Sequence, residues 1–178
     1  MYYGNIVNYD IANGAGLRVS LFVSGCTHHC KECFNEKTWD FNYGEPYTPE
    51  VKEHILGLLN QNGIKGLTVL GGEPFEKANQ KDVYELVKAA KERNPEQTVW
   101  IYSGYLYEEL RDKYNIRVRT EYTDKLLDII DVLVDGEFEI ENKDLMLKYK
   151  GSTNQRVILV PKTIEKGEVV VSEVYNQY

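Results

Sequence analysis

Short runs of β-branched and aromatic residues alternate along the chain with stretches of helical periodicity. The runs predict strands at Val19–Ser24, Leu67–Gly71, Thr98–Tyr102, Val132–Asp135, Arg156–Val160 and Glu168–Val171. Two of them, LTVLG and DVLVDG, are almost continuously apolar, which is typical of strands covered on both faces. The pattern therefore indicates a sheet that is packed on each side.

Four helices are predicted between these strands, because apolar residues recur there on one helical face. Thr48 is a suitable N-cap for the first helix, and Pro49 suits its first helical position. The other three begin near Asn79, cover Leu106–Lys113 and begin at Thr123. The alternation of strands and helices predicts an α/β fold with a mainly parallel sheet. The chain is too short for eight βα units, so a partial open (β/α) barrel or a doubly wound sheet is expected.

Composition narrows the class of protein without changing this fold. The 178 residues show no internal repeat, low-complexity segment or linker, so residues 1–178 are expected to form a single domain. No apolar run is long enough to cross a membrane, and the first ten residues do not look like a signal peptide. We therefore expect a cytoplasmic protein that does not contact membranes. A formal charge of 21 − 28 = −7 speaks against nonspecific nucleic-acid binding.

The negative charge is concentrated in one region. Residues 121–144 hold nine acids and two bases, a sum of −7, while the other residues balance at 19 against 19. We expect this region to form a solvated face.

Glycine-rich or chemically capable residues follow four consecutive predicted strands. These segments are Gly25–Cys33, Gly71–Pro74, Ser103–Tyr105 and Asp135–Phe138. The carboxyl ends of parallel strands meet at one edge of a sheet, and ligands bind there. We therefore expect the four segments to form one rim around a binding site.

Three cysteines, Cys26, Cys30 and Cys33, lie within eight residues in a C-x3-C-x2-C pattern. An odd number of clustered thiols points to a metal centre rather than to a disulfide framework. A cubane iron–sulfur cluster normally uses four cysteines, so three would leave one iron open. A structural zinc site with His28 or His29 as fourth ligand and three ordinary thiols are the alternatives. If a cluster is present, we expect both histidines to be exposed loop residues.

The C-x3-C-x2-C spacing on a loop after the first main predicted strand is the signature of the radical S-adenosylmethionine enzymes. Further stretches resemble the proteins that activate anaerobic ribonucleoside-triphosphate reductase: Asn13–Cys26, Cys33–Asn35, Gly71–Pro74, Tyr102–Tyr105, Val134–Phe138 and Gly151–Arg156. The chain is thus similar, over nearly its whole length, to this family of radical S-adenosylmethionine glycyl-radical activating enzymes.

The resemblance implies a [4Fe–4S] cluster held by Cys26, Cys30 and Cys33, with one iron left to bind S-adenosylmethionine. In the family, reductive cleavage of this cofactor yields methionine and a 5′-deoxyadenosyl radical. That radical takes the Cα hydrogen of a glycine in the reductase and leaves a glycyl radical there. The implied partners are the reductase, through its glycine loop, and a low-potential electron donor such as flavodoxin, for which Lys31 and Lys37 are candidate contacts.

The resemblance also implies which residues contact S-adenosylmethionine: Glu32, Cys33, Phe34, Gly71, Gly72, Glu73, Ser103 and Asp135. Many members of the family carry an aromatic residue just before the last cysteine. Here that position is Glu32 and the aromatic Phe34 lies one place after the cysteine, so backbone around these positions is expected to hold the adenine. No further catalytic group is implied.

Plainer interpretations remain open at each of these positions. Gly71–Pro74 could be a strand-to-helix turn, and Ser103 and Asp135 could belong to simple turns. Arg18 is expected to pair with an acid rather than to contact a substrate. No chemical role is predicted for Asn154, Gln155 or Arg156.

Two other functions remain open as well. One is an activase of the pyruvate formate-lyase type, against which the short chain and the GSTNQR segment speak. The other is a non-catalytic zinc-binding interaction module, which would leave GGEP and the rim unexplained.

Overall fold

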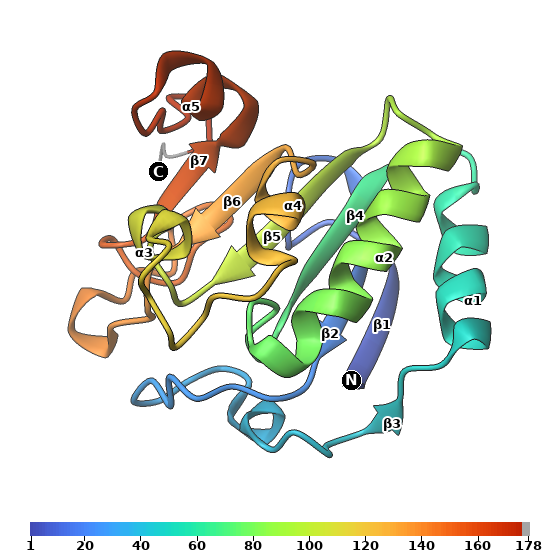
Figure 1. The fold of residues 1–178 in the computed structure, drawn as a ribbon, viewed down its shortest axis with the longest axis horizontal. Coiled ribbons are helices and arrows are strands. Elements are labelled where there is room, and N and C mark those ends of the chain that lie inside the picture. Colours follow the sequence, from blue (N-terminus) through green and yellow to red (C-terminus); the bar gives the residue numbers. More distant parts are fainter. Residues whose placement is uncertain (176–178) are drawn as a thin grey trace.

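The computed structural model describes residues 1–175, which form a seven-stranded mixed sheet flanked by helices (Figure 1). The strand order is β3-β1-β2-β4-β5-β6-β7. The strands are β1 Tyr2–Asp10, β2 Leu17–Val23, β3 Glu45–Pro46, β4 Ile64–Gly71, β5 Thr98–Ser103, β6 Val132–Asp135 and β7 Arg156–Leu159. The pairs β2–β4, β4–β5 and β5–β6 are parallel, and the pairs at the two edges are antiparallel. The expectation of an α/β fold is confirmed, with parallel pairing confined to the middle of the sheet.

The helices are α1 Pro49–Leu59, α2 Lys77–Arg93, α3 Tyr107–Arg111, α4 Thr123–Leu127 and α5 Val160–Lys166, with two 3₁₀ turns, η1 Glu36–Trp39 and η2 Ile140–Asn142. The predicted cap of α1 is confirmed, because the Thr48 side chain accepts a hydrogen bond from the Val51 amide. In Figure 1, α1, α2 and α4 lie over the sheet, whereas α5 lies beyond its β7 edge. No helix in residues 1–175 is long and apolar enough to cross a membrane.

One strand prediction was wrong, and one strand was not predicted. Glu168–Val171 does not form a strand, and only Val171 makes an isolated bridge to Ile158. Conversely, Tyr2–Asp10 forms the long strand β1, which its sequence did not indicate because polar Asn5, Asn8 and Asp10 interrupt the apolar pattern. β1 lies against β2 with irregular register, so its pairing with a neighbouring strand, rather than its own pattern, specifies it.

The alternation of side chains along the central strands separates two faces of the sheet. Val19, Leu21 and Val23 of β2 belong to the main core cluster, which also contains the buried residues of α1, α2 and α4. On the opposite face, Trp100, Val132, Val134 and Val157 form a smaller cluster. Covered faces on both sides explain why Leu67–Leu70 of β4 are all buried, as the continuous apolar run indicated.

Arg18 lies on the face opposite the helices, and the expectation that it pairs with an acid was wrong. Its guanidinium is fully buried and donates to the Thr68 and Thr98 hydroxyls and to three backbone carbonyls, those of Ala15, Leu67 and Thr98. Burial lowers the pKa of Arg18 to about 10, although nearby Tyr102 and acids oppose this. Since every donor has an acceptor, this side chain ties the strands together and leaves no donor for a ligand.

Candidate functional site

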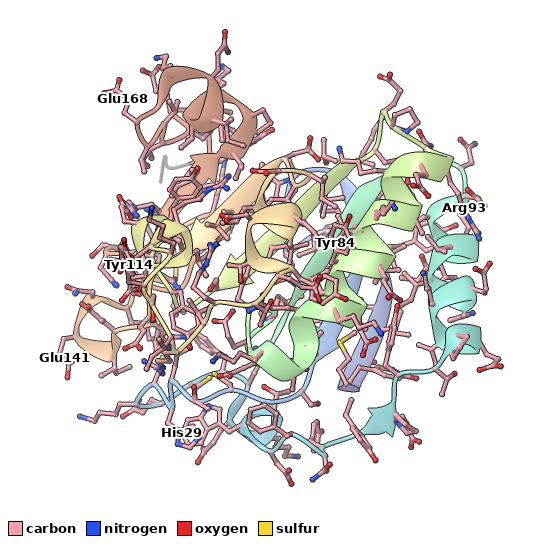
Figure 2. The ribbon with its side chains drawn as sticks, in the orientation of Figure 1. His29, Tyr84, Arg93, Tyr114, Glu141 and Glu168 are labelled. Carbon is pink, nitrogen blue, oxygen red and sulfur yellow. The ribbon has the colours of Figure 1, made fainter. Side chains whose placement is uncertain are left out.

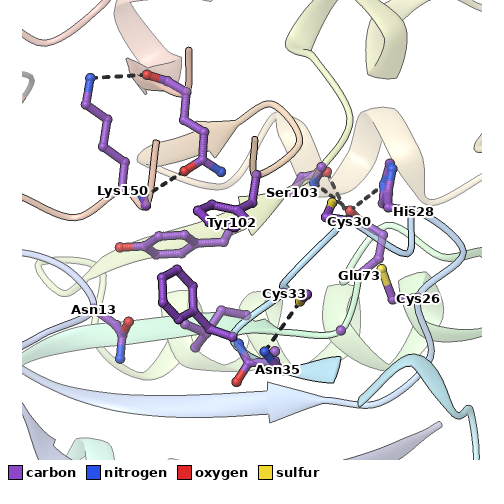
Figure 3. A pocket seen from close by; sticks show the side chains of 18 of the residues that line it. Asn13, Cys26, His28, Cys30, Cys33, Asn35, Glu73, Tyr102, Ser103 and Lys150 are labelled. Atoms are coloured by element: carbon purple, nitrogen blue, oxygen red, sulfur yellow. Dashed lines mark hydrogen bonds and ion pairs between the residues drawn. The ribbon is translucent and has the colours of Figure 1, made fainter. Parts of the chain in front are cut away.

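A cavity of about 460 Å³ opens at the carboxyl ends of the parallel strands. Of the residues expected to bind cluster or cofactor, Cys26, Cys30, Cys33, Phe34, Gly71, Gly72, Glu73 and Ser103 line it. Figure 3 shows the three cysteines, Glu73 and Ser103 around this space. The expected rim is therefore present. Glu32 and Asp135 do not line the cavity, and Glu32 is exposed on the loop.

The cysteine loop follows β2 and is held by backbone hydrogen bonds to the segment that comes after it. The Gly25 amide donates to the Thr38 carbonyl at 2.8 Å, and the Cys26 amide to the Trp39 carbonyl at 3.3 Å. His29 and Glu32 have positive φ angles of 53° and 56°, which turn the chain sharply between the cysteines. These turns let three thiols from one short loop line the same cavity.

The three thiols are free, and their surroundings suit an iron–sulfur cluster. Burial, with Glu73 nearby, raises the pKa of Cys26 to about 12, and burial likewise raises the pKa of Cys30. Such thiols become thiolate ligands only when a bound cation offsets the cost. The Asn35 amide already donates to the Cys33 sulfur at 3.4 Å, a type of contact that tunes cluster potentials. Within residues 1–175, no three His, Cys, Asp or Glu side chains surround a position for one metal ion.

His28 is not the exposed loop residue that was expected. Its side chain is only 3% exposed, with Nε2 at 3.1 Å from Glu73 Oε2 and Nδ1 at 2.6 Å from Glu137 Oε1. Burial disfavours the charged ring, but the two carboxylates outweigh it and raise the pKa of His28. Because both ring nitrogens are held by carboxylates, His28 joins three chain segments and is not positioned as a fourth metal ligand.

Glu73 connects the ends of the strands, a role that its sequence position did not reveal. Its side chain is only 1% exposed, and its carboxylate accepts four hydrogen bonds. The donors are the Phe75 amide, the Ser103 hydroxyl, the Gly104 amide and His28 Nε2. The carboxylate therefore fixes the β4 end, the β5 end and the cysteine loop relative to one another.

Gly71 and Gly72 bring backbone close to the cysteine loop. Gly71 has a φ angle of 107°, and a Cβ on Gly72 would lie 2.6 Å from the Gly25 carbonyl oxygen. A side chain at Gly71 would collide with the backbone of Phe22 and Val23 in β2, and one at Gly72 would push against the cysteine loop. The two glycines therefore let the GGE turn pack closely against β2 and the cysteine loop, and both line the cavity.

Tyr102 lines the cavity on the face opposite the helices, and its hydroxyl is buried without a hydrogen-bond partner. Burial raises the pKa of this phenol well above its usual value. A buried hydroxyl without a partner is costly, so a ligand group that bonds to it would be favoured. Tyr102 belongs to the stretch Tyr102–Tyr105 that carried the family resemblance, but no role was predicted for its side chain.

The late GSTNQR segment acquires a structural role that sequence reasoning could not supply. Arg156 contacts both oxygens of the fully buried Asp135 at 2.5–2.9 Å and also pairs with Glu108. These acids raise the pKa of Arg156 further. Gln155 donates to the Gly136 carbonyl and Asn154 to the Glu137 carbonyl. The segment therefore holds the loop after β6, which forms part of the cavity wall.

Comparisons with known proteins agree with these features. A family model described as "4Fe-4S single cluster domain" matches residues 12–158. The chain is 40% identical to an anaerobic ribonucleoside-triphosphate reductase-activating protein of Vibrio cholerae over 157 residues, covering 87% of this chain and 96% of that protein. Proteins of the same name from Escherichia coli K12 and Enterobacteria phage T4 are 37% and 34% identical, covering 88% of this chain and 97% and 93% of theirs. The chain belongs to the family of anaerobic ribonucleoside-triphosphate reductase-activating proteins.

Proposed function

We propose that this protein is a radical S-adenosylmethionine activase that generates a glycyl radical on anaerobic ribonucleoside-triphosphate reductase. One observation carries the proposal: the three thiols of the C-x3-C-x2-C loop line the same cavity as the Gly71–Gly72 backbone, at the carboxyl ends of parallel strands. Membership of the family supplies the reaction class and the partner's identity. We further propose that residues 1–178 act as one domain and that the sheet is a partial open barrel of the radical S-adenosylmethionine type.

In this proposal Cys26, Cys30 and Cys33 hold a [4Fe–4S] cluster and leave one iron for S-adenosylmethionine. When bound, the cluster and the cofactor supply a 5′-deoxyadenosyl radical. The protein's own residues bind, orient and enclose the cofactor. The cavity that they form, of about 460 Å³, lies within the usual range for small-ligand sites, ~300–1,000 Å³.

The cofactor contacts follow from the residues that face the cavity. Cys33, Phe34, Gly71 and Gly72 present backbone or aromatic surface there, and Tyr102 lines the same cavity with a buried hydroxyl that has no partner within the described residues. Glu73 and Ser103 bond to each other at 3.0 Å, so their main contribution is to hold the wall in place. Glu32 stays a predicted contact, whereas for Asp135 we propose an indirect role in place of the predicted contact. Asp135, whose oxygens bind Arg156 and the Tyr107 amide, would act by positioning the Gly136–Phe138 segment.

The substrate of this reaction is a protein, and the cavity mouth offers apolar surface for it. Phe34 lines the cavity while being 62% exposed. Ile11 precedes the cavity-lining Ala12, and Leu145 and Met146 precede the cavity-lining Leu147; these three side chains are 74–83% exposed. Large exposed apolar groups at a site entrance are typical of a docking surface. We propose that the glycine loop of the reductase enters here, and that a low-potential donor such as flavodoxin provides the electron in the cytoplasm.

The experiment is anaerobic reconstitution followed by iron and sulfide analysis and electron paramagnetic resonance with the reductase. We expect ~4 iron and labile sulfide per chain, cleavage of S-adenosylmethionine under dithionite, and a glycine-centred radical on the reductase. Replacing Cys26, Cys30 or Cys33 singly by Ala should abolish cleavage, whereas Lys31→Ala, at an exposed position of the same loop, should not. A colourless protein with one zinc would refute the cluster, and cleavage without a glycyl radical would refute the substrate.

A further inference from the structure

The connection between α3 and α4 displays large apolar side chains together with positive charge. Its segment Lys113–Arg117, hereafter the donor loop, contains Tyr114 at 79% exposure and Ile116 at 85% exposure. Lys113 stacks on the Tyr114 ring at 5.5 Å. Tyr114 lies at the outer edge of the molecule in Figure 2, far from α1 and the labelled Arg93. Exposed aromatic and basic side chains are the types enriched in protein interfaces.

The donor loop is held rigidly, so these side chains are not exposed through flexibility. The Tyr114 amide donates to Asp112 and the Arg117 amide to Asn115, whose own side chain donates to the Glu109 carbonyl. The next residue, Val118, is fully buried, and Gln80 of α2 donates to its carbonyl at 2.6 Å. A surface that is ordered before binding loses less conformational entropy when a partner docks.

The donor loop contacts the cysteine loop directly, from outside the cavity. Arg117 Nη2 lies 3.3 Å from both the carbonyl and the hydroxyl oxygen of Thr27, which stands between Cys26 and Cys30. The Arg117 guanidinium also lies 5.1 Å from the Tyr105 ring, which in turn is 4.4 Å from the His28 ring. None of the residues 113–117 lines the cavity. A protein on this surface would approach the thiols without blocking the cavity mouth.

The charges on and around the donor loop indicate what kind of protein would bind there. The chain carries −7 overall, yet Lys113 and Arg117 make no ion pair in the described part of the chain. The neighbouring Arg111 and Arg119 are neutralised by Asp124 and Asp128. On the cysteine loop itself, Lys31 faces Glu141 at 3.9 Å and so contributes less positive potential than its position suggested. The donor loop therefore places two bases without an ion-pair partner in the described residues beside the cysteine loop, and these complement an acidic protein.

We propose that the donor loop is the docking surface for an acidic protein that donates single electrons to the site. This inference rests on the proposed function, in which each cleavage of S-adenosylmethionine consumes one electron. The donor's reduced prosthetic group loses that electron and the cysteine-bound centre gains it, so no further oxidant or reductant is required. Because the reductase is proposed to bind at the cavity mouth, donor and substrate occupy different surfaces.

The test compares a protein donor with a chemical one. Lys113→Glu and Ile116→Ser alter exposed side chains that do not contact the cysteine loop, and Lys162→Glu on α5 is the matched control. With a reduced flavodoxin as probe, we expect the KM for the donor to rise ~10-fold in the double variant, as for loss of an interface anchor. The cleavage rate under dithionite and the control variant should stay at the wild-type level. Isothermal titration of flavodoxin into the reconstituted protein should show a matching loss of affinity that increases at low salt.

Each contrary result has a distinct meaning. An unchanged KM and unchanged affinity for the donor would overturn the proposal. A dithionite-driven rate that falls equally would also overturn it, because the variants would then act on the fold. A higher KM for the reductase with dithionite present would assign the donor loop to the substrate protein instead. Wild-type protein that cleaves nothing under dithionite would refute the proposed function, independently of where the donor binds.

Discussion

The two faces of the central sheet differ in chemistry although the same strands form both. Toward α1, α2 and α4, β2 and β4 present Val19, Leu21, Val23, Leu67 and Val69, all in one apolar cluster. Toward the other side the intervening residues include Arg18, Ser20 and Thr68, which are buried and polar. Alternation along a strand makes this division possible. One face thus buries apolar strand residues, whereas the other buries polar groups alongside its smaller apolar cluster.

This difference between the two faces separates residues that stabilise the fold from residues that form the site. The helix-covered face excludes water with side chains that have no polar atoms to satisfy. On the cavity side, the Tyr102 hydroxyl is buried without a partner, and Glu73 and Asp135 are buried carboxylates held by several donors. Such groups cost stability and are retained where a ligand or a fixed geometry requires them.

The largest expected loss of stability is on the helix-covered face. Leu21→Ala removes a fully buried side chain of β2 and should lower the free energy of unfolding by roughly 2–5 kcal/mol. The KM for S-adenosylmethionine should not change at a temperature where the variant is folded. Phe22→Leu, on the cavity side of the same strand, is the matched variant and should cost about 1 kcal/mol. Equal costs in chemical denaturation would contradict the division between the faces.

Glu73→Gln should affect both stability and the site, because Glu73 joins strand ends from the cavity side. The amide group would place a donor against either the Gly104 amide or the Phe75 amide, leaving a buried donor unsatisfied at a cost of roughly 1–3 kcal/mol. The β5 end and the cysteine loop should loosen, which hydrogen exchange at Gly104 and Phe75 would report. Ser103→Ala removes only one of these bonds and should have a smaller effect. Unchanged exchange in Glu73→Gln would show that Glu73 does not hold the site.

Tyr102→Phe should produce the smallest change in stability and a selective change in binding. Its hydroxyl has no partner in the protein, so its removal should leave the free energy of unfolding unchanged or slightly higher. If the hydroxyl bonds to the bound cofactor, the KM for S-adenosylmethionine should rise roughly 3- to 10-fold, the value of one hydrogen bond. Tyr47→Phe is a matched control, since the Tyr47 hydroxyl is also buried without a partner but packs against the helix-side core. An equal KM for S-adenosylmethionine in both variants would show that the Tyr102 hydroxyl does not contact the cofactor.

Acidic residues show how far sequence reasoning extends. The stretch from Glu121 to Asp144 was expected to be a solvated face, and five of its nine acids are exposed and only Asp135 is buried. Three of the acids, Asp124, Asp128 and Asp131, also form ion pairs with Arg111, Arg119 and Lys91. Glu137 binds His28 and the buried Asp135 binds Arg156. Charge spacing along the chain therefore predicted the exposure of most of these acids, whereas their ion-pair partners and the burial of Asp135 depend on packing.

Most of the fold could be predicted from the sequence, because the signals for strands and helices are local. The central strands and the N-cap of α1 follow from runs and periodicities of a few residues, whereas β1 required a neighbouring strand to pair with. The rim was predictable for a related reason, since parallel strands bring their carboxyl ends to one edge whatever their loops contain. The individual roles at that rim, those of Glu73, His28 and Tyr102 above all, were not.

By itself, the sequence determined what depends on neighbours in the chain. The spacing of Cys26, Cys30 and Cys33 confines three thiols to one loop, and Gly71-Gly72 permits a turn that other residues resist. Only the tertiary structure decided contacts between distant residues: His28 with Glu137, Asp135 with Arg156, and Arg117 with Thr27, separated by 109, 21 and 90 positions. The physical reason is that such contacts exist only after the core has packed, because apolar burial, and not the polar residues themselves, brings those segments together.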